Sequence, residues 1–410
     1  MLIHWIWLAT RPNMNDRQKK LVLDAFGDPE DAFCEGEAAY LQIEGLHKEA
    51  LEALKDKNLA EAQKILRQCV DKDISICTYH DKTYPKRLKH IVDPPLILYC
   101  KGILPDMEAA PVIAAVGTRR ASAYGMNVSR RMGYQIAACG GILVSGVAAG
   151  IDGMAMQGAL LAGGSVIGVL GCGVDVVYPK SNSRLFSDME RNGCLISEFP
   201  PETQPYRWNF PKRNRIISGL SNGVVVIEAP EGSGSLITAR QALEQGRDVF
   251  CVPGNVDMPT FAGSNALMRD GAIPVRDGWD VVSEYESMYP DAIHPMETVS
   301  GPRDASDDEK AVPKVAEKPR YPKRKRSIDK KIEENPIDNS SKQPYSDLKD
   351  KLSKLPDVER QIVELLTSER LVDDLIAETG LPAAKVGAAL TMLEIKGVIK
   401  RLPGKRISLK

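Results

Sequence analysis

The chain has 410 residues, of which 43% are hydrophobic and 27% charged, and its formal net charge at pH 7 is −1. This length predicts two or three domains with a sizeable core, and the composition is that of a soluble globular protein. A charge so near zero argues neither for nor against nucleic acid as a ligand, so an anion site would depend on local clusters of basic residues. No apolar run approaches the roughly 18 residues that a membrane span needs.

The eight cysteines are scattered singly, without a Cys-x-x-Cys pair, and none of the five histidines pairs with another at ligand spacing. These patterns predict no metal site and no cofactor. Cysteines inside apolar runs are typical of proteins of the reducing cytoplasm, where we expect this protein. The apolar start, Met1–Trp7, is short and lacks a basic n-region and a cleavage site, so we expect it to be core rather than a signal peptide.

Residues 1–70 are predicted to form a helical domain, because apolar residues recur there at helical spacing. Leu41–Ala50 has the pattern of two helices joined by a glycine turn, as in small DNA-binding modules of the SAM or helix-hairpin-helix kind. A helical cap or an oligomerisation element is the favoured alternative. In residues 74–102 the prolines exclude a helix interior, which predicts an extended lead-in with one short strand at Leu96–Tyr99.

Residues 71–285 are predicted to form the main domain. Its apolar runs lie at Val112–Val116, Ile142–Ser145, Val166–Leu170, Cys194–Glu198, Val224–Ile227 and Val249–Val252. Helical patterns fill most of the gaps, at Met126–Cys139, Asp152–Leu161, Arg184–Arg191 and Leu236–Gln245. Strands spaced in this way with crossover helices predict an α/β fold, an extended Rossmann-like, doubly wound parallel sheet.

Glycine-rich turns that carry hydroxyls or charges follow four of these strands, at Gly117–Arg120, Ser145–Asp152, Gly171–Lys180 and Glu228–Ser235. Ligands of open parallel sheets bind outside the carboxyl ends of the strands, so we expect the turns to form one polar groove. Small residues let a phosphate approach the backbone, and the following helix offers free N–H groups. Arg119 and Arg120 can fork onto phosphate oxygens. These four turns therefore favour a binding site for an extended anionic ligand over turns that only connect strands to helices.

The segment Trp208–Ile217 combines aromatic and basic residues. Its cations are Lys212, Arg213 and Arg215. Beside them Phe210 can offer a base-stacking face, the combination found in proteins that bind single-stranded nucleic acid. The alternative is that Phe210 belongs to the core and that an arginine pairs with Glu198 or Glu228.

Enzyme motifs are absent from the main domain. The first turn lacks the dinucleotide-binding Gly-x-Gly-x-x-Gly, and no phosphate-binding loop of the Gly-x-x-x-x-Gly-Lys-Ser/Thr type is present. Catalysis would have to rest on Asp152, Glu198 and Glu228, each of which can instead cap a helix or pair with an arginine. We therefore expect a protein that is not an enzyme.

Residues 286–345 lose apolar periodicity and gain Pro, Asp, Lys and Ser, which predicts a disordered linker. Its basic run, Lys318–Arg326, can attract nucleic acid non-specifically, although a merely solvated linker is an equal alternative. Residues 346–410 are predicted to form a winged helix, with helices at Asp357–Thr367, Leu371–Thr379 and Ala383–Lys396 and a hairpin of Val398–Arg401 and Arg406–Leu409. The third helix of this domain has few side chains that could donate hydrogen bonds to base edges. Contact with another protein or with the DNA backbone is therefore favoured over recognition of a DNA sequence.

The motifs of the main domain follow one another in a characteristic order, which is Gly117–Arg119, Ser145-Gly146, Gly150–Asp152, Tyr178-Pro179, Ser197-Glu198, Phe210–Ile216, Glu228, Ser233–Ser235, Thr238-Ala239 and Val252–Gly254. In this order, which runs from about 79 to 277, the chain resembles the DNA-processing protein A (DprA, also called Smf) family. One position departs from that resemblance, because the family usually has histidine after Ala155 and this chain has Met156.

The resemblance implies a protein that binds single-stranded DNA, forms homodimers, protects incoming DNA in natural transformation and helps to load the recombinase RecA. Arg119 would contact phosphate and Phe210 would stack on a base. The full set of expected DNA-binding residues is Gly117, Thr118, Arg119, Arg120, Ser145, Gly146, Lys180, Phe210, Lys212, Arg213, Asn214, Arg215, Ser233, Gly234 and Ser235.

Two alternatives use the same sheet. One is a sensor that binds a small nucleotide, and the other is an enzyme similar to the phosphoribohydrolases. In the motif of those enzymes the final acid is replaced here by Thr238, so their expected catalytic carboxylate is missing.

Overall fold

The computed structural model describes residues 1–295 and parts of 356–409, namely 356–366, 370–371, 375, 378–379, 386, 389–390, 393, 399–402 and 406–409. The chain divides into two compact units, Met1–Val315 and Ala316–Lys410. A membrane-spanning helix is not found among the described residues.

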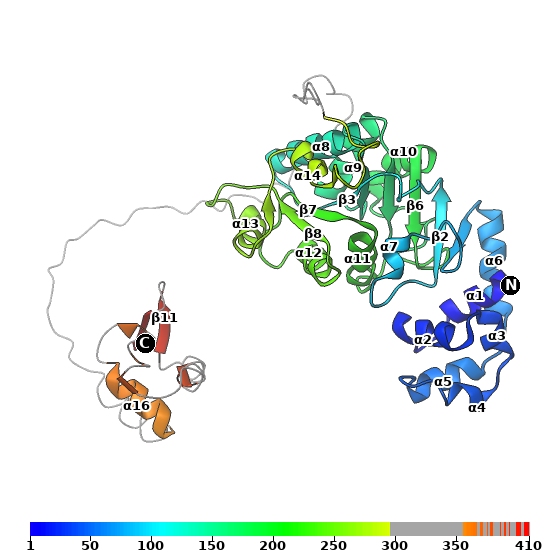
Figure 1. Cartoon of the computed structure of the whole chain (residues 1–410), viewed down its shortest axis with the longest axis horizontal. Coiled ribbons are helices and arrows are strands. Elements are labelled where there is room, and N and C mark those ends of the chain that lie inside the picture. Colours follow the sequence, from blue (N-terminus) through cyan, green and yellow to red (C-terminus); the bar gives the residue numbers. More distant parts are fainter. Residues whose placement is uncertain are drawn as a thin grey trace, which may run out of the picture. The chain divides into compact units, whose positions relative to one another are not determined.

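A nine-stranded sheet organises the first unit (Figure 1), in the order β1-β2-β6-β5-β4-β3-β7-β8-β9. Its strands are β1 (Ser75–Thr78), β2 (Ile97–Gly102), β3 (Val112–Val116), β4 (Ile142–Ser145), β5 (Val166–Val169), β6 (Gly193–Ser197), β7 (Gly223–Val226), β8 (Asp248–Cys251) and β9 (Ile273–Pro274). In this order, all neighbouring strands between β6 and β9 pair in parallel. At the other edge, β1 pairs with β2, and β2 with β6, in antiparallel orientation. The predicted doubly wound parallel sheet is confirmed.

Helices cover both faces of the sheet (Figure 1). One layer contains α8 (Ala123–Ala138), α9 (Ile151–Leu161), α10 (Ser183–Asn192) and α14 (Gly278–Val282), and the other contains α7 (Lys86–Lys89), α11 (Asn209–Leu220), α12 (Gly234–Glu244) and α13 (Ala262–Arg269). Because strands covered on both faces need apolar side chains at every position, β3 is a continuous apolar run. Its Ile113 packs in one core cluster, and the next residue, Ala114, packs in the other.

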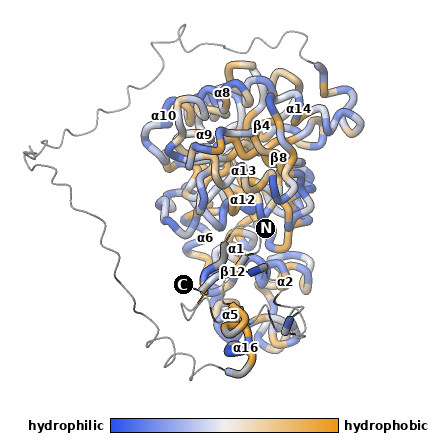
Figure 2. The backbone as a smooth tube through the Cα atoms, turned by 90° about the vertical axis from the view of Figure 1, so that its left-hand side faces the viewer, coloured by the Kyte–Doolittle hydropathy of each residue, from blue (hydrophilic) through white to orange (hydrophobic). Residues whose placement is uncertain are grey.

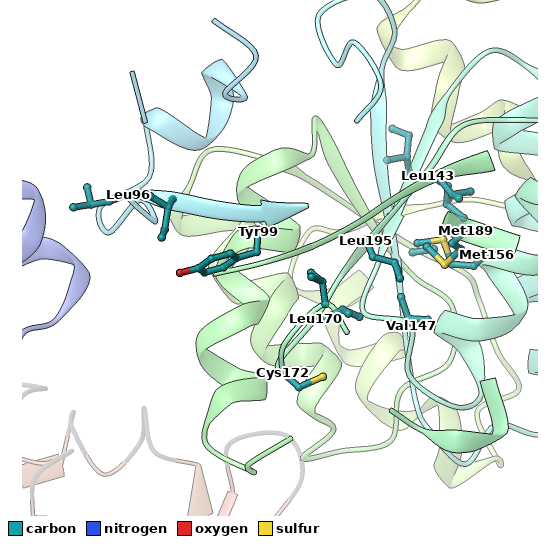
Figure 3. Packing of buried hydrophobic residues seen from close by; sticks show 14 of the residues in the cluster. Leu96, Tyr99, Leu143, Val147, Met156, Leu170, Cys172, Met189 and Leu195 are labelled. Atoms are coloured by element: carbon teal, nitrogen blue, oxygen red, sulfur yellow. The ribbon is translucent and has the colours of Figure 1, made fainter. Parts of the chain in front are cut away.

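The core between the sheet and the layer that contains α8, α9 and α10 consists of buried apolar side chains (Figure 3). Leu143 of β4 and Leu195 of β6 meet Met156 of α9 and Met189 of α10, and all four side chains are fully buried. Figure 2 shows the most hydrophobic segments running through the middle of the unit, along the strands. Met156, which stands where the family usually has histidine, therefore serves to pack the core of this chain.

Six helices precede the sheet, namely α1 (Leu2–Ala9), α2 (Asp16–Phe26), α3 (Pro29–Cys34), α4 (Glu37–Tyr40), α5 (Lys48–Lys55) and α6 (Ala60–Asp71). In α1, the side chains of Ile6, Trp7 and Leu8 are fully buried, so the apolar N-terminus is core, as expected. The glycine turn predicted within Leu41–Ala50 connects α4 to α5.

The sequence patterns missed four helices of the sheet domain, namely α7, which lies in the segment expected to be extended, α11, α13 and α14. Of these, α11 matters most for the groove. Residues 209–220 form α11, although Pro211 lies in its first turn. Proline is tolerated there because the first N–H groups of a helix have no intrahelical partner. The spacing of apolar residues did not indicate this helix, because α11 buries Arg213 and Arg215 as well as Ile216 and Ile217.

The packed chain continues beyond residue 285, where the sequence suggested that a linker begins. Ile293 is buried, and the backbone N–H of His294 donates to the carbonyl oxygen of Cys139 at 3.3 Å. The remainder of the proposed linker, 296–345, lies outside the described residues, and so does the basic run Lys318–Arg326.

The second unit contains α16 (Asp357–Leu365) and a three-stranded sheet of β10 (Arg370–Leu371), β12 (Arg406–Leu409) and β11 (Ile399–Leu402). The hairpin that the sequence predicted is β11 and β12. Leu371 pairs with Arg406 as strand, rather than beginning the second helix. Buried Ile362, Leu390 and Ile407 belong to one small core.

Candidate functional site

A groove of about 760 Å³ opens where β3 and β7 end. The sheet order reverses at β3, because β4 to β6 lie on one side of it and β7 to β9 on the other. Such a switch point is where open α/β sheets bind ligands. We call this cavity the groove; its lining includes Gly117–Arg120, Asp152, Tyr178, Pro205, Arg207, Phe210, Pro211, Arg213, Asn214 and Pro230–Ser235.

The turn after β3 is held in place by contacts with Ile151 and Glu228. A Cβ on Gly117 would lie 2.6 Å from Cγ1 of Ile151 and 2.8 Å from the carbonyl oxygen of Glu228, so no larger residue fits. The Thr118 N–H donates to that same carbonyl at 2.7 Å. The fully buried Glu228 carboxylate accepts from the N–H and the hydroxyl of Ser122, which caps α8. The turn therefore presents the exposed Arg119 and Arg120 on a fixed frame.

Arg119 lies over the ring of Phe210, with its guanidinium carbon 4.9 Å from the ring centroid. The Tyr178 ring is tilted against Phe210 at 5.6 Å. Underneath, a Cβ on Gly171 would approach Cδ1 of Phe210 to 2.9 Å. The phenyl ring is thus partly buried in the groove wall, and a guanidinium occupies the place that a base could take.

Arg213 forms the floor of the groove and is 4% exposed. Its Nη1 donates to the carbonyl oxygen of Gly146 at 3.0 Å and to that of Val169, whereas its Nε has no partner. Burial lowers the pKa of Arg213 to about 10, against the attraction of Asp152. Burial likewise raises the pKa of Asp152, and Arg213 opposes that shift. A buried cation with an unused N–H suits an anionic ligand.

The N-terminus of α12 forms the opposite wall. Ser233 caps this helix by accepting the Ser235 N–H at 3.4 Å, and the two hydroxyl oxygens are 2.8 Å apart. Asn214 donates to the carbonyl oxygen of Gly234 at 3.4 Å, which links the two walls. The positive end of the helix dipole and the free N–H groups favour an anion here.

The structure brings ten of the fifteen expected residues together in the groove lining. They are Gly117, Thr118, Arg119, Arg120, Phe210, Arg213, Asn214, Ser233, Gly234 and Ser235. Arg207 also lines the groove, although the sequence reasoning did not select it. Its position between Pro205 and Trp208, just before the basic segment, was the available signal. Among the described residues, none forms an ion pair with Arg119, Arg120 or Arg207.

Three other expected residues lie near the groove without lining it. Ser145 is fully buried and donates to the carbonyl oxygen of Ala115 at 2.6 Å. Gly146 contributes its backbone to Arg213 and Asp152. Lys180 is exposed at the start of a 3₁₀ turn, outside the lining. The first two residues therefore support the floor of the groove.

Lys212 and Arg215 face away from the groove, toward the N-terminal helices. Lys212 pairs with Asp16 of α2 at 2.9 Å and with Glu198 at 3.3 Å. Arg215 pairs with Asp16 at 2.8 Å, Glu198 at 2.5 Å and Asp93 at 3.0 Å. The structure confirms that an arginine of this segment pairs with Glu198. The other part of that alternative is wrong, because Phe210 lines the groove instead of belonging to the core.

The three carboxylates that could have served catalysis are all engaged in structure. Glu198 pairs with Arg215, Glu228 accepts from Ser122, and Asp152 accepts the Gly146 N–H at 3.2 Å. Only Asp152 lines the groove. Among the described residues, no three His, Cys, Asp or Glu side chains come together as metal ligands.

Comparisons with known proteins agree on one family. The family model described as DNA recombination-mediator protein A matches residues 75–286, and the DprA winged helix domain matches 347–405. Protein Smf of Synechocystis sp. is 31% identical over 371 residues, which cover 89% of this chain and 88% of the relative. DNA processing protein DprA of Bacillus subtilis is 43% identical over 221 residues, 54% of this chain and 74% of the relative.

A solved structure supports the same relationship. The X-ray structure of DNA processing protein A (DprA) from Streptococcus pneumoniae matches with a TM-score of 0.62 at 34% sequence identity. The match covers 69% of this chain and 98% of that one.

Proposed function

Because this chain belongs to the DprA/Smf family of DNA recombination-mediator proteins, we propose that its groove binds single-stranded DNA. The observation that carries the proposal is the lining itself. Four arginines, namely Arg119, Arg120, Arg207 and Arg213, and the N-terminus of α12 surround a space beside the Phe210 ring. The lining contains two acidic residues, Asp152 and Glu231. This combination suits a single strand, because cations bind its phosphates and aromatic faces stack on its bases.

Single strands fit this site better than duplex DNA for a physical reason. A ligand must bring phosphates to Arg119 and bases to the ring beneath it, within one groove. Bases of a duplex are stacked and paired inside the helix, whereas those of a single strand can turn toward a protein surface. Binding requires Arg119 to exchange its contact with Phe210 for a phosphate, which leaves the ring face for a base.

The wider role that we propose is that of a recombination mediator. The protein would protect incoming single strands in natural transformation, load the recombinase RecA onto them, and act as a homodimer without catalysing a reaction. Membership of the family supports this role, and so does the engagement of Glu198 and Glu228 in structural contacts. We also propose that residues 1–70, 71–285 and 346–410 form a helical domain, a sheet domain and a winged-helix domain, the first two of which are packed together through Asp16 and Arg215.

The test is the binding of a fluorescent oligo-dT across a salt series. The wild-type chain should bind tightly, prefer the single strand over excess duplex competitor, and weaken steeply as salt rises, because neutralised phosphates release counterions. Arg119→Ala should weaken binding and flatten the salt dependence. Lys212→Ala is the matched control, because it removes a cation of the same segment that faces Asp16 instead of the groove. Absence of oligo-dT binding at low salt would refute the proposal.

A further inference from the structure

Two exposed aromatic rings lie beside the groove and are not part of its lining. Tyr206 and Trp208 are 48% and 71% exposed. Their rings are stacked, with centroids 4.8 Å apart and planes 4° from parallel. Tryptophan contributes a large apolar surface when it is buried, so an open tryptophan face next to a binding site can still make contacts. We call these two residues the aromatic pair.

The segment that carries the aromatic pair is fixed in place. The Tyr206 N–H donates to the carbonyl oxygen of Gln204 at 2.8 Å, and the Tyr206 carbonyl accepts the Asn209 N–H at 3.0 Å. The buried Asn209 side chain donates to the carbonyl oxygen of Gly171 at 3.0 Å. Trp208 is the N-cap residue of α11. Because the backbone is held at these points, the two rings are positioned before any ligand arrives.

The aromatic pair continues the groove. Pro205 and Arg207 alternate with the two aromatic residues along the chain, and both line the groove. Phe210, two residues after Trp208, lines it as well. A strand that leaves the groove past Arg207 would therefore meet the open face of Trp208 next. Every nucleobase has a flat aromatic face, so such a stack accepts any base without reading sequence.

We propose that Tyr206 and Trp208 form a second base-stacking site, which holds a nucleobase of single-stranded DNA outside the groove. The inference rests on the proposed function of the groove. A base adds a third member to the stack of two rings, and Arg207 holds the neighbouring phosphate. This site lengthens the bound strand by contacts that are not ionic.

Tryptophan fluorescence reports this contact directly. The chain has four tryptophans, of which Trp5 and Trp7 are buried and Trp279 is half-buried. Trp208 is the exposed one, so a base stacked on it should quench its emission. Oligo-dT should quench the wild-type chain, and an abasic strand of equal length, which keeps the phosphates, should not. The variant Trp208→Phe, which keeps a ring but not the indole, should lose the quenching.

Affinity measurements separate the stacking site from the groove. Trp208→Ala should weaken oligo-dT binding by about 5- to 150-fold, the range for one stacked base, and by the same factor at low and high salt. Trp208→Phe should recover most of that loss. Abasic strands should bind Trp208→Ala and wild type equally. Val70→Ala, which removes an apolar side chain that is 75% exposed on α6, is the control and should bind normally.

The outcomes distinguish failure of this site from failure of the groove. Normal oligo-dT binding by Trp208→Ala, without quenching in the wild type, would overturn the stacking site and leave the groove intact. A change in sedimentation of Trp208→Ala without a change in affinity would assign the rings to contacts between copies, and would also overturn it. Absence of oligo-dT binding in every variant, wild type included, would overturn the groove as well.

Discussion

Arg213 and Arg215 lie two residues apart on α11 and face opposite sides of that helix. Arg213 donates to the carbonyl oxygen of Gly146 and forms the groove floor, whereas Arg215 pairs with Asp16 of the N-terminal helices. One helix therefore connects the candidate DNA site to the contact that holds α2 against the sheet domain. Both guanidinium groups are buried, so each depends on the partners that surround it.

Replacement of Arg213 should destabilise the fold as well as the site. Arg213→Met keeps the length of the side chain but leaves the Gly146 and Val169 carbonyls and the Asp152 carboxylate without their cation. Leaving a buried hydrogen-bond acceptor without its donor costs about 1–3 kcal/mol. We expect a loss of that size in the free energy of unfolding, measured with urea. A loss below about 1 kcal/mol would mean that the floor does not depend on this cation.

Asp16 should make the docking of the N-terminal helices sensitive to acid. Burial raises the pKa of Asp16, but the attraction of Arg215, Lys19 and Lys212 outweighs it and lowers the pKa to about 2. A carboxyl with a depressed pKa in the folded state stabilises it above the unfolded value, near 4, and loses that contribution as pH falls toward 2. The contribution at neutral pH is about 2 kcal/mol.

The measurement is urea unfolding of wild type and Asp16→Asn between about pH 6 and pH 2, followed by the emission of the buried Trp5 and Trp7. The wild type should be more stable at the upper end, and the difference should shrink as pH falls through the window between 4 and 2. Burial raises the pKa of Glu198, whose effect has the opposite sign. The difference between the two chains is therefore the informative quantity, and a constant difference would contradict the prediction.

Arg207, which the sequence did not single out, and Lys212, which it did, should behave differently in DNA binding. Arg207→Ala should weaken oligo-dT binding and lower the slope of log affinity against log salt by about 0.7, the value for one phosphate of a single strand. Lys212→Ala should leave the slope unchanged, because its cation is held by Asp16 and Glu198. Equal slopes for the two variants would mean that the groove lining does not mark the path of the strand.

Gly125 should be irreplaceable for a packing reason. A Cβ at this position would lie 1.7 Å from Oε2 of Glu228, so Gly125→Ala must displace the carboxylate that Ser122 donates to. We expect a cost of about 1–3 kcal/mol from overpacking alone, measured as a lower thermal midpoint. Gly234→Ala is the control, because a Cβ there meets nothing within 4 Å in the first turn of α12. It should be neutral or slightly stabilising.

The strands were predictable because they are buried on both faces. Each of β3 to β8 is mostly apolar, and glycine-rich turns follow β3, β4, β5 and β7. The groove was predictable for the same reason, since the carboxyl ends of parallel strands meet at one edge. Gly117 and Ser233, each directly after a strand or before a helix, therefore came together as expected.

The direction of each basic side chain was not predictable. Lys212, Arg213 and Arg215 look equivalent in the sequence, yet α11 lies between the groove, the sheet and the N-terminal helices. Since α11 has polar partners on two sides, its apolar residues form no simple stripe, and the helix itself was missed. Asp16, which decides where two of the three cations point, is about two hundred residues away in the chain.

The sequence by itself determined the class of the fold and the edge of the sheet at which the groove opens, and it predicted that the turns there bind phosphate. These follow from local properties, namely apolar runs, glycine positions and helix starts, which act over a few neighbouring residues. Only the tertiary structure decided which cations face the groove, that Arg119 covers Phe210, and that Trp208 remains open beside it. Those outcomes depend on which distant carboxylates and rings each side chain meets, because burial makes a charge depend on its partners.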